Sequence, residues 1–304
     1  MDGKHDIIDI YSEQSIIIPN QLNFLQIVTQ LRTDGVKFID FVSDFDSTLT
    51  RKASHLRDGS DSSYAIYSHS PYFSNELKET KNKLYHQYAP IERDSTMPVE
   101  KREELMQEWY SKTIELVSSQ VLTEKQLEES LLLTNMKLRH GVIELFDIIS
   151  HYEVPLYIIS AGIIDIISKF IKLAVPFEML KNMQIIANGK IDGHYMKPFV
   201  TATNKDKFLT KERYPNLRKN AIVVGDLVDD ISMVSKSAYK SMLKIGFFNT
   251  IHNDDSSIDP YLKNYDIILK GNGSLYHICY ILSKIIDIPM TYQENELSQL
   301  LNKI

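Results

Sequence analysis

Cysteine and tryptophan each occur only once among the 304 residues of this chain. With Cys279 alone, no disulfide can form within the chain, and a reducing compartment is the simplest setting. Cys279 lies in the mostly apolar run 275–286, which favours a buried structural thiol over a nucleophile. We therefore expect a cytoplasmic protein.

Long apolar runs and an excess of basic residues are also missing. No stretch of about 20 uninterrupted apolar residues occurs, so no membrane span is expected. Charged residues such as Asp2 and Lys4 interrupt the apolar ones near the N-terminus, so we expect no signal peptide. The net charge of −6 argues against nucleic acid as a partner, because binding a phosphate backbone needs a basic surface. A small phosphorylated substrate is compatible with this charge, and we expect a monomer.

Three short apolar runs each end in a polar cluster: 37–42 before 43–46, 156–159 before 160–162, and 221–224 before 225–226. Runs of this length rich in Ile, Val and Phe suit buried strands. Helical patterns follow two of them, over 163–173 and 230–240, and a further strand (267–269) precedes a helix over 274–286. This alternation predicts an α/β fold with a Rossmann-like parallel sheet and helices on both faces. Ligands bind beyond the carboxyl ends of such strands, where all three clusters lie.

The segment between the first two clusters has a different character. Residues 76–87, 99–119 and 123–133 are charged, have helical spacing and contain no convincing strand. Thr123 and Gln126 form a capping-box pattern, and Pro98 fits the first turn of the middle helix. We interpret residues 54–140 as an inserted α-helical cap that sets substrate specificity, with a loop over 60–74. Residues 1–53 and 141–304 then form the catalytic core.

Carboxylates dominate two of the clusters. Asp44 and Asp46 follow a strand at positions i and i+2, which alone fits a solvated acidic turn equally well. Asp226 and Asp230 follow another strand, and alone they fit an acidic helix N-terminus. Together they predict an oxygen-rich site for Mg²⁺, where a carboxylate can attack a phosphoryl group that the metal neutralises. A neighbouring acid must protonate the leaving alkoxide.

The remaining candidates would hold an anion. Ser160 opens a predicted helix, so it is either part of a phosphate-binding turn or an ordinary N-cap. Lys205 lies between the second and third clusters, where a cation is wanted to hold the phosphoryl group. Lys207 is a close rival for that role.

The order of these motifs resembles the haloacid dehalogenase superfamily of phosphohydrolases. Residues 43–49, 108–112, 159–163, 204–205 and 243–247 more closely resemble the cytosolic pyrimidine 5′-nucleotidase family. That family removes the 5′-phosphate of UMP and CMP, and one branch prefers 7-methylguanosine monophosphate. The resemblance implies a Mg²⁺-dependent 5′-nucleotidase that works through an aspartyl-phosphate intermediate.

The resemblance also implies a role for each matching position. Asp44 would be the nucleophile and a Mg²⁺ ligand, and Asp46 the general acid/base, with its backbone carbonyl on the metal. Asp226 would be the third protein ligand, supported by Asp230. The substrate-binding residues would be Ser160, Ala161 and Lys205 for the phosphate and Glu108, from the cap, for the polar edge of the base.

Two departures from the family leave alternatives open. Ser47 stands where the family usually has Met, and the resulting sequence of residues 44–48 is common among phosphoserine phosphatases. The stretch 51–72 also departs, so base preference is open, and Tyr64 or Tyr67 can either stack on a base or pack on the cap. The alternative function is therefore a phosphatase of phosphoserine or another small ester. A non-catalytic binding protein would not need all the catalytic positions. A receiver domain would lack both the insertion and an acid at Asp46.

Overall fold

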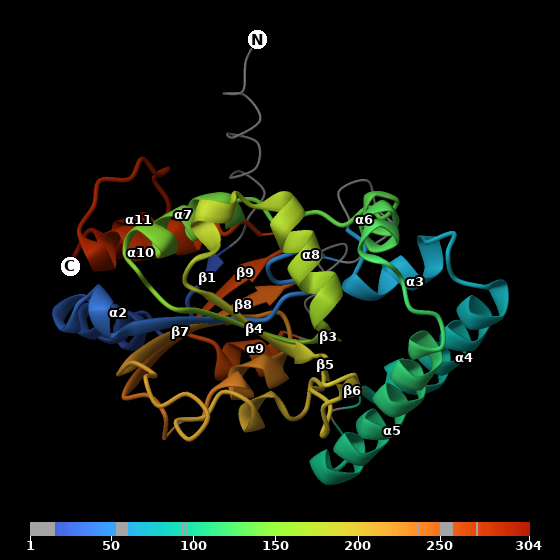
Figure 1. Cartoon of the computed structure of the whole chain (residues 1–304). Coiled ribbons are helices and arrows are strands. Elements are labelled where there is room, and N and C mark those ends of the chain that lie inside the picture. The colour runs from blue at the N-terminus through green and yellow to red at the C-terminus, as the bar shows by residue number, and fades with distance from the viewer. Residues whose placement is uncertain are drawn as a thin grey trace.

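The computed structural model describes residues 16–52, 60–92, 94, 96–235, 237–249, 258–271 and 273–304. A seven-stranded sheet with the order β1-β9-β8-β7-β2-β3-β4 runs through its centre (Figure 1). β1 pairs antiparallel with β9, and the other neighbours pair in parallel. The strands are β1 (Ile16–Ile17), β2 (Ile39–Ser43), β3 (Leu156–Ile163), β4 (Met183–Asn188), β7 (Asn220–Gly225), β8 (Ser241–Phe248) and β9 (Ile267–Lys270). The prediction of an α/β fold with a parallel sheet is confirmed.

The strand register brings the polar clusters to one edge. In β2, Ser43 lies opposite Ile158 of β3 and Val224 of β7. The backbone N–H of Asp44 donates to the carbonyl of Val224 at 3.0 Å, so the chain leaves the sheet directly after this pair. The residues that follow β2 and β7 therefore emerge side by side.

One face of the sheet is covered by helices with apolar inner sides. They are α2 (Gln21–Asp34), α7 (Val142–His151), α8 (Ile164–Ala174), α10 (Tyr276–Ile286) and α11 (Glu296–Leu301). α8 buries Ile166, Ile167 and Phe170, whose spacing follows the helical repeat. Burying each such side chain stabilises the fold by roughly 1.5–3 kcal/mol. α2, α7 and α11 were not among the helices expected from the sequence.

The other face is covered mainly by irregular chain. Val42, Tyr157 and Val223 of the sheet pack against residues 200–239, which include the short helices η4 (Lys205–Lys207) and η5 (Val228–Met233). α9 (Asp259–Asn264) packs farther along this face. The predicted helix over 230–240 is wrong, because η5 is a 3₁₀ helix that ends at Met233. Side chains of Ser232, Ser235 and Ser237 bond to each other or to nearby backbone, which competes with helix continuation.

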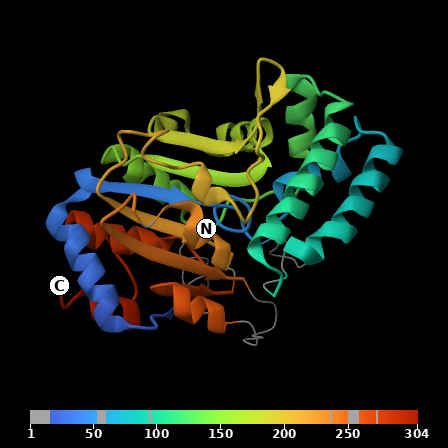
Figure 2. The same cartoon turned by 90° about the horizontal axis from the view of Figure 1, so that it is seen from below.

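A group of helices lies beside the carboxyl edge of the sheet (Figure 2). It comprises η2 (Ser63–Ala65), α3 (Ile66–His69), α4 (Asn75–Glu92), α5 (Val99–Ser118) and α6 (Glu124–Leu132). Three of them match predicted helices, and the capping box of Thr123 and Gln126 is confirmed. The region expected to be a loop holds η2 and α3, and Pro98 is the residue before α5 rather than in its first turn. The division into core and cap stays a prediction, since residues 53–59 lie outside the described part.

Polar contacts fix α5 against the core. The side chain of Gln107 both donates to and accepts from the backbone of Phe199, at 2.7 and 2.9 Å. Arg102 pairs with Asp229 at 3.0 Å, next to Asp230. A small hairpin of β5 (Lys190–Ile191) and β6 (His194–Tyr195) completes the fold. In the part of the chain that the structure describes, no helix is long and apolar enough to cross a bilayer.

Candidate active site

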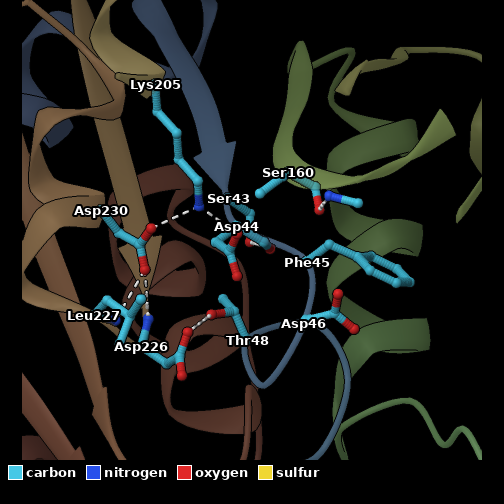
Figure 3. A network of polar contacts seen from close by, with 12 residues as sticks. Ser43, Asp44, Phe45, Asp46, Thr48, Ser160, Lys205, Asp226, Leu227 and Asp230 are labelled. Carbon is cyan, nitrogen blue, oxygen red and sulfur yellow. Dashed lines mark hydrogen bonds and ion pairs between the residues drawn. The ribbon is translucent and has the colours of Figure 1, made fainter. Parts of the chain in front are cut away.

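Three carboxylates meet at the carboxyl edge of the sheet. Asp44 follows β2, and Asp226 and Asp230 follow β7 (Figure 3). One oxygen of each lies within 4.8 Å of the others. Hard oxygen ligands from separate chain segments fit a divalent metal ion, which prefers this donor type. The structure thus brings together the side chains of three of the four predicted metal-binding residues, and Asp46, the fourth, was expected to bind through its backbone carbonyl.

The turn after β7 is shaped around Asp230. Its Oδ2 accepts hydrogen bonds from the backbone N–H groups of Asp226 and Leu227, at 3.1 and 2.9 Å. Residue 225, which precedes Asp226, must be glycine, because a Cβ at Gly225 would lie 2.3 Å from the Cβ of Asp230. The close approach of Asp230 to the strand end therefore depends on Gly225.

Lys205 reaches this cluster from η4. Its ammonium donates to Asp44 Oδ1 at 2.5 Å and to Asp230 Oδ1 at 2.7 Å, and its side chain is 4% exposed. Its rival Lys207 instead forms an exposed pair with Glu103. Lys205 is thus the cation that the sequence pattern places between the second and third motifs.

Burial controls the electrostatics of the cluster. It raises the pKa of Asp44, although the positive charge of Lys205 offsets part of the shift. It raises the pKa of Asp226 too, and the negative charge of Asp230 adds to the effect. Burial opposes the charge of Lys205, but Asp230 and Asp44 together raise the pKa of that ammonium. A cluster with this excess of negative charge favours a bound cation.

Asp46 points away from the three carboxylates (Figure 3) and contacts the start of the helical insertion. Its Oδ1 accepts from the backbone N–H of Ser63 at 2.7 Å, and its Oδ2 accepts from the Ser63 hydroxyl at 2.5 Å. Burial raises the pKa of Asp46, whereas the Ser63 contacts lower it. Ser63 was not identified from the sequence, since one serine in a Ser-rich segment carries no motif.

Ser160, Ala161 and Gly162 lie at the end of β3. The sequence suggests that Ser160 opens a helix, but β3 continues to Ile163 and α8 begins at Ile164. The strand shifts register between Ile159 and Ile163, so these residues leave the regular sheet. The hydroxyl of Ser160 accepts from the N–H of Gly162 at 3.0 Å, in a turn beside Asp44.

A second layer of polar groups holds the turn that follows Asp46. Ser47 has a left-handed backbone (φ 60°), which is uncommon for a non-glycine residue. Its carbonyl accepts from the side chains of Asn249 and Arg139, and Arg139 also donates to the carbonyl of Thr48 at 2.8 Å. Thr48 and Asn249 in turn approach the carboxylate of Asp226, at 3.4 and 3.5 Å. Arg139 and Asn249 lie outside the motifs and were missed.

A cavity of about 1100 Å³ joins the carboxylates to the helical insertion. Its insertion side is formed by aromatic side chains that include Tyr64, Trp109 and Tyr110. The Tyr64 hydroxyl donates to the carbonyl of Ala161 at 3.2 Å, which ties this wall to the irregular end of β3. The other aromatic candidate, Tyr67, is buried against Phe73 and does not line the cavity.

Glu108 is not among the described residues that line the cavity. Its carboxylate accepts from Lys112, one turn along α5, and from Tyr88 of α4. The inner side of α5 carries Met106, Tyr110 and Ile114, and Glu108 falls two residues from the nearest of these. Glu92, at the end of α4, lines the cavity instead. Burial raises the pKa of the Tyr64 and Tyr110 hydroxyls, and the negative charge of Glu92 adds to both shifts.

Comparison with known proteins identifies the family. The sequence model of the pyrimidine 5′-nucleotidase (UMPH-1) family matches residues 47–286. A 7-methylguanosine phosphate-specific 5′-nucleotidase from Homo sapiens is 30% identical, over 83% of this chain and 89% of that protein. The protein of the same description from Gallus gallus is 28% identical, over 86% of this chain and 92% of its own length.

A solved structure supports the fold. The crystal structure of cytosolic 5′-nucleotidase IIIB bound to cytidine superposes with a TM-score of 0.76 and 23% identity, covering 93% of this chain and 97% of that one. The family match covers most of the chain and contains Lys205, Asp226 and Asp230. This chain therefore belongs to the pyrimidine 5′-nucleotidase (UMPH-1) family of phosphoric monoester hydrolases.

Proposed function

We propose that this protein is a Mg²⁺-dependent 5′-nucleotidase that hydrolyses CMP, UMP and 7-methyl-GMP to the nucleoside and phosphate. The observation that carries the proposal is the single cavity in which an acidic cluster faces an aromatic wall. The acidic cluster can process a phosphate ester, and the aromatic wall offers planar surfaces to a base. A cavity of about 1100 Å³ is far larger than phosphoserine requires.

Asp44 would attack the phosphorus atom and carry the phosphoryl group as an aspartyl-phosphate. Lys205, with the Ser160 hydroxyl and the backbone N–H of Ala161, would hold the phosphoryl oxygens. Mg²⁺, held by Asp44, Asp226, Asp230 and the backbone carbonyl of Asp46, would neutralise the charge of the phosphoryl group.

Asp46 would supply the protons. Burial raises the pKa of Asp46, which favours the protonated form. Its carboxyl group would donate to the leaving 5′-oxygen of the nucleoside and then accept a proton from the attacking water. The two hydrogen bonds from Ser63 fix the orientation of this carboxyl group. A carboxyl group that is already oriented loses less entropy on reaching the reactive geometry, which would lower the barrier.

Glu92 is the residue that we assign to the base. It lies in the wall that contains Trp109 and Tyr110, where a carboxylate can accept from an exocyclic amine or face the cationic ring of 7-methylguanine. Glu108 was the sequence-based candidate for this role, but its contacts with Lys112 and Tyr88 direct it elsewhere.

A turnover panel tests the proposal. We expect Mg²⁺-dependent phosphate release from CMP, UMP or 7-methyl-GMP with a kcat/KM well above the values for AMP and phosphoserine. Glu92→Gln should raise KM for the preferred nucleotide by about 10-fold or more and leave hydrolysis of p-nitrophenyl phosphate nearly unchanged. Glu108→Gln is the matched control on the neighbouring helix and should change neither. Phosphoserine as best substrate would contradict the nucleotidase assignment.

We further propose that the protein acts in the cytoplasm as a monomer. The single thiol, Cys279, is buried, which is consistent with a reducing compartment. Sedimentation of the purified chain at micromolar concentration should give a mass near 35.1 kDa.

A further inference from the structure

The cavity contains a second lysine besides Lys205, on the helices between β2 and β3. Lys81 of α4 lines it and is half-buried. Its ammonium donates to the hydroxyl of Ser68 at 2.7 Å, and no carboxylate pairs with it among the residues that the structure describes. Lys205, at the catalytic end, has two carboxylate partners. The two lysines of the cavity therefore differ in that only Lys81 lacks a negative partner.

A partly buried ammonium without a counter-charge is costly unless a ligand supplies one. Burial lowers the pKa of Lys81, which reflects this cost. Lys81 lines the cavity that the substrate would occupy, so an anionic group of the substrate is the natural partner for its ammonium.

The surroundings of Lys81 are rich in hydrogen-bond donors. Ser68, His69, Asn82 and His86 also line the cavity, and all four are solvent-exposed. The carboxylate there, Asp61, is engaged by His69 at 3.3 Å and by the backbone N–H of Asn135 at 2.8 Å. Several donors around one ammonium suit the multiple oxygens of a phosphate better than a single carbonyl oxygen.

The size of the cavity leaves space for such a group. Pockets of about 300–1,000 Å³ hold ligands of drug size. The cavity here, at about 1100 Å³, exceeds that range, so it can hold a mononucleotide and a further substituent.

We propose that the Lys81 end of the cavity is a second phosphate-binding subsite, which accepts a phosphate carried by the ribose of the substrate. The chain would then hydrolyse the 5′-phosphate of nucleoside 3′,5′-bisphosphates and bind them more tightly than the 5′-monophosphates. This subsite rests on the proposed nucleotidase function, because it assumes that the scissile 5′-phosphate occupies the Asp44 end.

The test compares CMP with cytidine 3′,5′-bisphosphate on the full chain with Mg²⁺. Products are separated by chromatography, so that loss of the 5′-phosphate is distinguished from loss of the 3′-phosphate. We expect a KM for the bisphosphate at least about 10-fold below that for CMP, as a charge-assisted hydrogen bond provides. Lys81→Met should remove this advantage and leave the KM for CMP within about 2-fold of wild type. Lys81→Arg should keep most of it.

Lys83→Met is the matched control, since Lys83 lies on the same helix, is exposed and does not line the cavity. It should retain the full preference. Equal KM values for the two substrates in the wild type would overturn the subsite. So would an equal loss on both substrates in Lys81→Met.

Binding without turnover gives a second readout. Trp109 is the sole tryptophan and lines the cavity, so its fluorescence reports occupancy in EDTA. Tighter binding of the bisphosphate than of CMP, abolished by Lys81→Met, would support the subsite even if neither compound were hydrolysed, in which case the nucleotidase function alone would fail. Hydrolysis of CMP without any bisphosphate preference would retain that function and reject the subsite.

Discussion

Replacing Lys205 by Met tests whether its ammonium holds the acidic cluster together. The side chains of Lys205, Asp44 and Asp230 are 4%, 9% and 1% exposed. Methionine keeps the length of the side chain but leaves the two carboxylates without their cation. Breaking a buried ion pair from one side costs about 3–5 kcal/mol.

This loss of stability predicts a lower melting temperature (Tm) for Lys205→Met. Unfolding entropy is about 2.1 cal/mol/K per residue, so 304 residues give about 0.64 kcal/mol/K. Dividing the cost by this entropy predicts a Tm about 5–8 °C below wild type. The measurement is calorimetry in EDTA at about pH 8, where no metal replaces the lost charge.

The deficit should depend on pH with a definite sign. The raised pKa of Lys205 means that its stabilising contribution is complete at neutral pH and is lost only in strong alkali. The pKa of Asp44 is also raised, chiefly by burial, so the folded state binds that proton more tightly than the unfolded state. Stability therefore rises as pH falls through the raised value of Asp44 toward its ordinary value of about 3.9. Without Lys205, protonating Asp44 stabilises the folded state more than it does in the wild type. The Tm difference between Lys205→Met and wild type should therefore be smaller at about pH 5 than at about pH 8.

Lys207→Met provides the control within the same short helix. Its side chain is 51% exposed and pairs with Glu103, and exposed pairs contribute at most about 1 kcal/mol. Its Tm should fall by no more than about 2 °C. A Lys205→Met protein that melts with the wild type at about pH 8, or that shows the same deficit at both pH values, would refute the electrostatic reasoning.

Further variants test other parts of the site. Asp44→Asn should lower turnover below about 10⁻³ of wild type, measured as phosphate release, because an amide is a poor nucleophile. Asp46→Asn should lower kcat by roughly 10²–10⁴-fold with a nucleotide, and a loss of only a few fold would contradict its acid/base role. Gly162→Ala should impair turnover, since the new Cβ would lie 2.9 Å from the Ser63 hydroxyl oxygen. Arg139→Met should weaken Mg²⁺ binding in calorimetry by about 10-fold, with Arg139→Lys less affected.

The central part of the fold and site could be predicted because its signals are local. A short run rich in Ile, Val and Phe predicts a buried strand, and β2 and β7 carry such residues shortly before Asp44 and Asp226. The parallel pairing then places their carboxyl ends at one edge. Thr123 and Gln126 likewise mark a helix start by their spacing alone. In each case the informative residues are neighbours in the sequence.

The insertion side of the site could not be predicted, because its contacts join distant segments. Ser63 reaches Asp46 across 17 residues and carries no motif of its own. Lys81 and Glu92 face the cavity only because α4 packs on α5. The outward position of Glu108, in contrast, could have been predicted from the sequence of α5. The buried stripe of Met106, Tyr110 and Ile114 fixes the inner side of α5, and Glu108 lies off that stripe.

One continuous segment contacts both the turn after β2 and the aromatic wall of the cavity. The chain leaves the turn that holds Asp46, forms the helical insertion, and returns at Arg139, which donates to the carbonyls of Ser47 and Thr48 in that same turn. Near its start the insertion supplies Ser63 to the proposed acid/base, and midway it supplies the aromatic wall. A shift of the insertion must therefore move the partner of Asp46 and the contacts around Thr48 together, since both are carried by its ends. Asp46 and the aromatic wall are thus linked by chain connectivity, and under the proposed function a substrate that fails to seat α4 and α5 would also misplace the proposed proton donor.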